Sequence, residues 1–318
     1  MQKWWIYQGN TKPHDGISRL PEPPPWRQFT DKARAARGLQ YRPSSREVEL
    51  VNVALYLRRP LLITGKPGVG KTSLAYAVAH ELNLGEVLRW SITTQTRLQD
   101  GLYRYDAIAR LQDSSIQGND APPDIGQYLR LGPLGTAFTA NQKPRVLLID
   151  EIDKSDIDLP NDLLHIFEEG EFEIPELART QEDSHKIQPH DEGNKVTIEH
   201  GRVRCHAFPL VIMTSNGERE FPPAFLRRCL QLDIPLPDPK KLMEILKAHL
   251  QLDTSHEPKI KKLLAEFMKR RDMDKNELAT DQLLNAMYMA MKDIDPLERD
   301  REELLNALWR SLSGGEGL

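Results

Sequence analysis

The sequence predicts an α/β fold, in which helices cover both faces of a parallel sheet, followed by a small all-α domain. The first observation is that short apolar runs alternate with segments of helical periodicity between residues 46 and 237. This alternation is typical of parallel sheets, because the crossover between two parallel strands usually contains a helix. The second observation is that past Pro237 only amphipathic helical segments remain. The third is a glycine-rich loop directly after the first apolar run.

Five apolar runs, each bounded by polar or turn-forming residues, are the predicted strands. They occupy residues 60–65, 86–93, 145–153, 208–216 and 230–237. Before the first run, Val48, Val51 and Leu55 recur at a spacing of about 3.6 residues, which predicts a helix over residues 46–59. A second helix is predicted over residues 71–84. Together these elements favour a parallel sheet sandwiched by helices.

Three domains follow from this pattern: an N-terminal arm over residues 1–40, an α/β domain over 41–238 and a helical lid domain over 239–318. The arm contains LPEPPPWRQF, residues 20–29, and its prolines exclude a helix interior or a central strand. Two interpretations stay open, a linker packed on the surface and a partner-docking arm. In the lid domain the predicted core stripe consists of Leu283, Leu284, Met287 and Met291.

Composition excludes several classes of protein. The 318 residues suffice for two domains with a sizeable core. A formal net charge of −4 argues against a polycation that coats nucleic acid. No apolar run approaches the roughly 20 residues that a bilayer span needs, and residues 1–10 lack the apolar stretch of a signal peptide. Cys205 and Cys229, which lack CxxC spacing, favour a reducing compartment, so we expect a cytoplasmic protein without a membrane partner.

The glycine-rich loop has the chemistry of a phosphate-binding loop. GKPGVGKTS matches the pattern G-x-x-x-x-G-K-[ST], whose glycines let backbone N–H groups point at phosphate oxygens. Its lysine would reach the β- and γ-phosphates, and its threonine hydroxyl would ligate Mg²⁺. A simple glycine-rich turn is the alternative, but the loop's position between a strand and a helix favours the P-loop. The candidate residues are Gly65, Lys66, Pro67, Gly68, Val69, Gly70, Lys71, Thr72 and Ser73.

Two acidic residues, Asp150 and Glu151, follow the apolar run of residues 145–149. In an open parallel sheet, ligands bind at the carboxyl ends of the strands. Asp150 is therefore a candidate to hold Mg²⁺ together with Thr72, directly or through water. Glu151 is the candidate general base that polarises the attacking water.

The phosphate loop, LLIDE, VIMTSN and FPPAFLRRC, in this order, resemble the AAA+ ATPases over most of residues 41–318. The segment IGQYLRLGPLGTAF, residues 125–138, is similar to an element of the MoxR branch of that family. This resemblance implies a P-loop NTPase fold and a β-hairpin formed by residues 171–177 and 196–205.

The resemblance also implies roles for residues beyond the phosphate loop. Asn216 resembles sensor 1, which helps to place the lytic water. Arg228, with Arg227 as second candidate, resembles the arginine finger that acts on the nucleotide of a neighbouring subunit. Such a finger implies a homo-oligomeric ring, expected to be a hexamer. One departure is the usual sensor 2 position, where Thr280, Asp281 and Gln282 stand and no arginine is found.

The leading hypothesis is a MoxR-like ATPase that hydrolyses ATP with Mg²⁺ in a ring and remodels a partner protein in a chaperone-like way. By resemblance, a protein with a von Willebrand factor A domain is the expected partner. GTP is disfavoured because no N-K-x-D segment is present. Two alternatives stay open, an ATP-dependent signalling or defence switch and a DNA-directed motor, which the basic segment from Lys32 to Arg46 would support. His185 and His190 are expected in a solvated loop.

Overall fold

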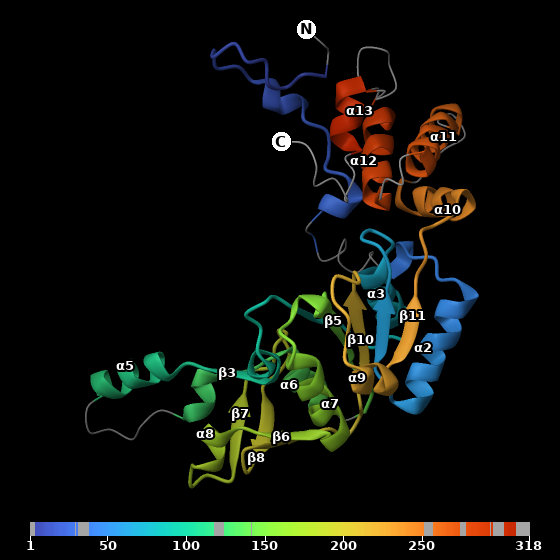
Figure 1. Cartoon of the computed structure of the whole chain (residues 1–318). Helices are drawn as coiled ribbons and strands as arrows, with labels where there is room; N and C mark the ends of the chain where they lie inside the picture. The colour runs from blue at the N-terminus through green and yellow to red at the C-terminus, as the bar shows by residue number, and fades with distance from the viewer. Residues whose placement is uncertain are drawn as a thin grey trace. The chain divides into compact units, whose positions relative to one another are not determined.

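The computed structural model describes residues 4–28, 30, 38–117, 124–140, 142–250, 257–273, 278–292, 294 and 302–309 (Figure 1). Its larger compact unit, residues 43–235, is built on a five-stranded sheet with the order β11-β1-β10-β5-β2. Every pairing in this sheet is parallel. The strands are β1 (Leu61–Thr64), β2 (Leu88–Ser91), β5 (Val146–Asp150), β10 (Leu210–Ser215) and β11 (Leu230–Asp233). All five predicted strands and the α/β fold class are therefore confirmed.

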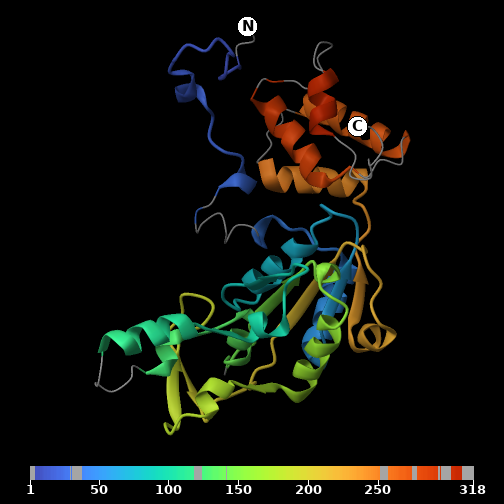
Figure 2. The same ribbon diagram turned by 60° about the vertical axis from the view of Figure 1, so that its left-hand side comes forward.

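Helices flank this sheet (Figure 2). The first is α2, whose N-terminus carries a capping box: Ser44 Oγ accepts from the backbone N–H of Glu47, and the Glu47 carboxylate accepts from that of Ser44. Helix α2 packs on β1 and β11, whereas α3 packs on β5 and β10. The α-helices of this unit are α2 (Ser45–Leu57), α3 (Lys71–Glu81), α4 (Leu98–Leu102), α5 (Ala107–Gln117), α6 (Pro133–Phe138), α7 (Leu159–Glu169), α8 (Pro175–Ala178) and α9 (Pro223–Arg228). Two short 3-10 helices, η3 (Ile125–Tyr128) and η4 (Ile152–Lys154), complete it.

Two smaller antiparallel sheets extend the unit. One pairs β3 (Tyr103–Tyr105) with β4 (Leu129–Leu131). The other has the order β6-β9-β8-β7. Its strands are β6 (Glu171–Glu173), β7 (Ser184–Ile187), β8 (Val196–Glu199) and β9 (Arg202–Arg204). Strand β6 pairs with β9, so the expected association of residues 171–177 with 196–205 is confirmed, within a larger sheet than a hairpin.

The expectation of a solvated loop is wrong for His185. This residue lies in β7 and is only 4% exposed. Its Nε2 lies 2.8 Å from Thr180 Oγ1, and its Nδ1 lies 3.1 Å from Asp124 Oδ1. The imidazole can be buried because both ring nitrogens have hydrogen-bond partners. His190, by contrast, is exposed in the loop after β7, as expected.

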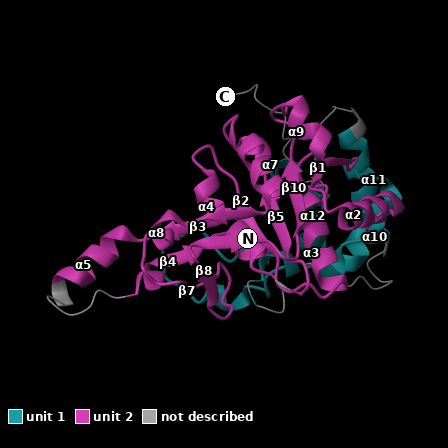
Figure 3. Cartoon of the chain, turned by 90° about the horizontal axis from the view of Figure 1, so that it is seen from below, with its two compact units in different colours: residues 1–42, 236–318 teal, residues 43–235 magenta. Residues whose placement is uncertain are grey.

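The second compact unit consists of residues 1–42 and 236–318 (Figure 3). Its α-helices in the described residues are α10 (Pro239–Leu250), α11 (Glu257–Met273), α12 (Thr280–Met291) and α13 (Glu302–Leu308). The predicted stripe is core, because Leu283, Leu284 and Met287 are buried and Met291 packs against them. None of the helices in the described part combines the length and the apolar character that a bilayer-spanning helix requires.

The N-terminal arm forms one compact unit with the lid helices. It contains η1 (Gly16–Arg19) and η2 (Pro25–Arg27). Trp26 Nε1 donates to Asn285 Oδ1 at 3.2 Å, and its ring packs edge-on against Tyr288. The Tyr288 hydroxyl in turn donates to the backbone oxygen of Glu22. These contacts favour the surface-packed interpretation of the arm around its Pro-rich segment. The basic positions 32, 34 and 37 lie outside the described residues.

The two cysteines give a test of the fold. Both thiols are free, and burial raises the pKa of Cys205 to about 11 and that of Cys229 to about 12. Because the thiolate is the reactive form, about 0.1 % or less of either thiol is reactive at pH 8. We expect native protein to react slowly with DTNB at pH 8, with the rate rising as pH approaches 11. Denatured protein, in which both thiols react at once, is the control. A fast-reacting native thiol would contradict the burial of these side chains.

Candidate nucleotide site

The loop between β1 and α3 has a backbone that only glycine adopts readily. Gly65, Gly68 and Gly70 have φ values of 145°, 78° and 98°, all in the region that side chains disfavour. At Gly65 a Cβ atom would also lie 2.4 Å from the backbone oxygen of Ile234. Gly70 is the N-cap of α3, so the positive end of this helix borders the loop. The geometry is that of an anion-binding loop.

Lys71 lies inside this loop and is only 7% exposed. Its ammonium donates to the backbone oxygens of Gly65 at 2.6 Å and Lys66 at 3.0 Å, and to Asn216 Oδ1 at 2.8 Å. Burial lowers the pKa of Lys71, while the nearby carboxylates of Asp153, Asp150 and Glu151 oppose that shift. The structure thus brings together two predicted site residues, Lys71 and Asn216, from distant parts of the chain.

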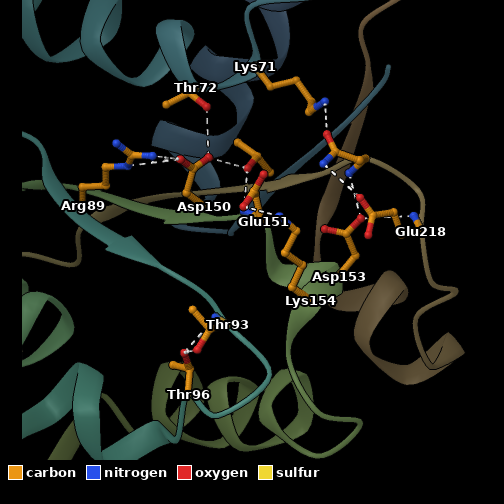
Figure 4. A network of polar contacts seen from close by, with 12 residues as sticks. Lys71, Thr72, Arg89, Thr93, Thr96, Asp150, Glu151, Asp153, Lys154 and Glu218 are labelled. Carbon is orange, nitrogen blue, oxygen red and sulfur yellow. Dashed lines mark hydrogen bonds and ion pairs between the residues drawn. The ribbon is translucent and has the colours of Figure 1, made fainter. Parts of the chain in front are cut away.

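Asp150, at the end of β5, is the centre of a polar network (Figure 4). Its Oδ1 accepts from Thr72 Oγ1 at 2.9 Å and from Thr214 Oγ1 at 2.7 Å. Its Oδ2 accepts from Arg89 Nε at 3.1 Å and from Arg89 Nη2 at 2.6 Å. Hydroxyl and carboxylate oxygens are the ligands that Mg²⁺ prefers, so Thr72 and Asp150 fit this ion. Thr72 and Asp150 would hold the ion, while Arg89 restrains the other carboxylate oxygen of Asp150.

Glu151 has a left-handed backbone, with φ 63°, directly after β5. Its N–H donates to Thr214 Oγ1 at 2.9 Å, and its carboxylate pairs with Lys154 Nζ at 2.8 Å. The hydrogen bond from Lys154 to Glu151 raises the pKa of Lys154. Both side chains of this pair are substantially exposed, and such pairs contribute only about 0–1 kcal/mol. Little free energy is therefore needed to separate the Glu151 carboxylate from Lys154.

Asp153 holds the backbone of the loop that carries Asn216. Its Oδ2 accepts from the N–H groups of Asn216 at 2.9 Å and Glu218 at 3.1 Å, and the side chain is only 3% exposed. Among the described residues, its Oδ1 is buried without a hydrogen-bond partner. Two charge-assisted bonds to one loop fix where the Asn216 side chain begins.

The arginine pair lies at the other end of the sheet. Arg227 and Arg228 end α9 immediately before β11, and both are exposed. In the register of β1 with β11, Leu61 lies opposite Leu230 and Thr64 opposite Asp233. The pair therefore lies level with the start of β1, at least about 13 Å along the strands from the phosphate loop. Within one chain, the structure does not bring Arg227 or Arg228 to the loop.

Residues 60–229 match the family model of the AAA domain, dynein-related subfamily. The chain belongs to this AAA family. Its AAA domain is accordingly a P-loop NTPase domain of a nucleotide-binding family. A similar solved structure is NtrX from Brucella abortus in complex with ADP, with 12% sequence identity and a TM-score of 0.41. That match covers 84% of this chain and 54% of the NtrX chain, so this chain spans about half the length of NtrX. A search of curated proteins returned no match.

The expected sensor 2 position of this AAA protein serves a different purpose. Thr280, Asp281 and Gln282 form the first turn of α12, in the helical unit. The Gln282 side chain accepts from the N–H of Ala279 at 2.9 Å. This bond satisfies one of the N–H groups that every helix start leaves without a partner inside the helix.

The predicted set of residues for the AAA domain missed Arg89, Thr214, Asp153 and Lys154. Thr214, Asp153 and Lys154 lie within or beside the motifs VIMTSN and DEID, so a closer look at each motif's polar side chains could find them. Arg89 gives no such signal. It reaches Asp150 across the pairing of β2 with β5, whose register the sequence does not give.

Asp153 offers a test of the loop that carries Asn216. Asp153→Ala removes both bonds to the loop, and we expect turnover of ATP to fall by about 10- to 100-fold because Asn216 loses its position. ATP affinity should change less than turnover. Asp153→Asn is the matched control, since its amide oxygen can still accept both bonds. The measurement is phosphate release at saturating ATP. If Asp153→Ala is as active as the unchanged protein, Asp153 does not position Asn216 for turnover.

Proposed function

We propose that this AAA protein binds ATP with Mg²⁺, hydrolyses it in an oligomeric ring, and uses turnover to remodel a partner protein, as MoxR-type relatives do. The observation that carries the proposal is the convergence of Lys71, Thr72, Asp150 and Asn216 beside one glycine loop. A partner with a von Willebrand factor A domain is the first candidate, on the resemblance to the MoxR branch alone.

The phosphate loop and the residues around it bind the phosphates and would hold Mg²⁺. The backbone N–H groups of residues 65–70 and the positive end of α3 bind the phosphates. Lys71 exchanges its bonds to loop carbonyls for bonds to the β- and γ-phosphates. Thr72 and Asp150 would hold Mg²⁺, which supplies charge neutralisation at the phosphates when bound.

Glu151 and Asn216 act on the attacking water. Glu151 accepts a proton from the attacking water after leaving Lys154. Asn216, whose backbone Asp153 fixes, orients that water with its amide. Both residues follow strands that lie side by side in the sheet, β5 and β10, which is why they can act on one water.

The position of the arginine pair supports the ring. An arginine finger stabilises the charge of the transition state and must touch the γ-phosphate. Arg228 lies at the opposite end of β11 from its own phosphate loop, so it can serve only the site of a second subunit. A contact of this head-to-tail kind closes into a ring when the rotation between subunits permits it.

The test is ATP turnover per subunit as a function of protein concentration, with the size of the assembly measured in ATP and in ADP. We expect turnover per subunit to rise steeply over the range in which the assembly forms. Constant turnover per subunit from a monomer would overturn the ring, and absence of turnover in an assembled ring would overturn hydrolysis.

A nucleotide-dependent switch is the second candidate. The lack of an arginine at positions 280–282 favours it, because the absence of a sensor 2 arginine points to slow turnover. The variant Glu151→Gln separates the two functions. A remodelling enzyme loses its function in this variant, whereas a switch stays in the ATP-bound state. The DNA-directed motor has only Arg42 and Arg46 of its basic segment within the described residues, and absence of duplex binding at low salt would exclude it.

A further inference from the structure

Arg59 contacts the end of the helix that carries the arginine pair. This half-buried residue precedes β1, and its Nε donates to the backbone oxygen of Arg228 at 3.1 Å. Its Nη2 donates to the backbone oxygen of Arg227. The last carbonyls of a helix have no partner inside the helix, and a cation near them is stabilised by the helix dipole. The Arg59 guanidinium is thus the C-terminal cap of α9.

The sheet fixes this contact in place. The N–H of Leu230, two residues after Arg228, donates at 2.8 Å to the backbone oxygen of Pro60, the residue after Arg59. From there β1 and β11 continue in parallel register. The two carbonyls that Arg59 binds therefore lie beside a strand that ends in the phosphate loop of the same chain.

The side chain of Arg228 is held more loosely than its backbone. Its Nε donates to Glu168 on α7, but 49% of the arginine side chain and 53% of the glutamate side chain are exposed. An exposed pair of this kind contributes little to stability and is easily exchanged for a phosphate. The pair lines a hollow of about 240 Å³ together with Arg59 and the apolar side chains of Leu164, Phe167 and Phe208. The backbone of Arg228 is fixed while its guanidinium stays free to change partners.

We propose that Arg59 is a positioning residue for the trans-acting arginine: it holds the end of α9 so that Arg228 reaches the nucleotide of the neighbouring subunit. The inference rests on the proposed function. It adds that β1 connects two sites of one subunit: Arg59, which holds the end of α9, precedes this strand, and the phosphate loop follows it. Lysine is a poor replacement for Arg59, because its shorter side chain ends in a single nitrogen, whereas the guanidinium donates to the carbonyls of Arg228 and Arg227 from two separate nitrogens, Nε and Nη2.

The experiment mixes full-length variants and measures ATP turnover after the rings reassemble. Glu151→Gln has an intact finger and an inactive site, whereas Arg228→Ala has an intact site and no finger. In an equimolar mixture, about one quarter of the sites combine a working Glu151 with a neighbouring Arg228, so turnover should recover to that fraction. This first mixture tests the finger itself.

Arg59→Ala is then mixed with each of the two. Alone, it should lose about 10- to 100-fold in turnover with little change in ATP affinity. With Glu151→Gln it should recover to the level of the first mixture, because its own site is intact. With Arg228→Ala it should stay low, because neither partner presents a finger. A variant that merely misfolds would be rescued by neither partner and would also lose ATP binding.

Two further variants keep the proposal open to refutation. Arg59→Lys retains the charge and the fold, and it should also recover only with Glu151→Gln. Arg58→Ala is the neighbouring control: Arg58 lines the same hollow, but its guanidinium binds Leu55 within α2 instead of the end of α9, so its loss should leave turnover unchanged. Full activity of Arg59→Ala, or recovery with Arg228→Ala, would overturn the proposal. If turnover does not recover in the first mixture, Arg228 does not act on the neighbouring subunit, and Arg59 cannot have the role proposed here.

Discussion

Replacing Glu151 with glutamine is expected to reduce ATP turnover by about 100-fold or more while leaving ATP affinity nearly unchanged. Glutamine has the size of glutamate, but its amide cannot accept a proton from the attacking water. The residues that bind phosphate, Lys71 and Thr72, keep their contacts in this variant. Phosphate release under saturating ATP and equilibrium binding of a fluorescent ATP analogue measure the two quantities separately.

Lys154→Gln is the matched control for this prediction. It removes the ion pair that holds the Glu151 carboxylate but leaves the base in place, so turnover should stay the same or rise. If Glu151→Gln keeps more than half of the normal turnover, Glu151 is not the base. If both variants lose turnover and ATP binding together, the substitutions have disturbed the backbone after β5 instead of its chemistry.

Arg228→Ala is expected to reduce turnover by about 1,000-fold at protein concentrations where the ring is complete. The loss should not depend on the ATP concentration, because Arg228 lies far from the phosphate loop of its own chain. Assembly and ATP binding should both persist. Turnover and particle size measured on the same sample decide the outcome.

Arg227→Ala provides the comparison within the same helix. Both arginines are exposed in the last turn of α9. A larger loss in Arg228→Ala than in Arg227→Ala assigns the finger to Arg228, and the reverse order assigns it to Arg227. Equal losses accompanied by dissociation of the ring would make the pair structural.

Local sequence patterns correctly predicted the parts of this protein that are formed by residues close together in the chain. The phosphate loop is one such part, because glycine spacing, lysine and threonine occur within nine consecutive residues and only glycine tolerates the backbone of Gly65 and Gly70. The central strands β1, β5 and β10 are another, because a strand buried on both faces needs a continuous apolar run. Asp150, Glu151 and Asn216 could be placed at strand ends for the same reason.

Contacts between segments far apart in the chain could not be predicted from local sequence patterns. His185 looked like a loop residue because it lies in a polar stretch, yet Asp124 and Thr180 allow it to be buried in β7. Arg89 binds Asp150 only because β2 lies next to β5. Its charge alone, on a short amphipathic strand, predicts nothing more than a solvated surface.

The sequence by itself determined the fold class, the nucleotide loop and the acidic strand end, since each is encoded within one short segment. The tertiary structure decided which charges restrain which functional groups: Arg89 on Asp150, Lys154 on Glu151, and Arg59 on the end of α9. It also decided that Arg228 lies at the far end of the sheet from its own loop. The physical reason is that a parallel sheet brings strands into contact in an order that differs from their order along the chain.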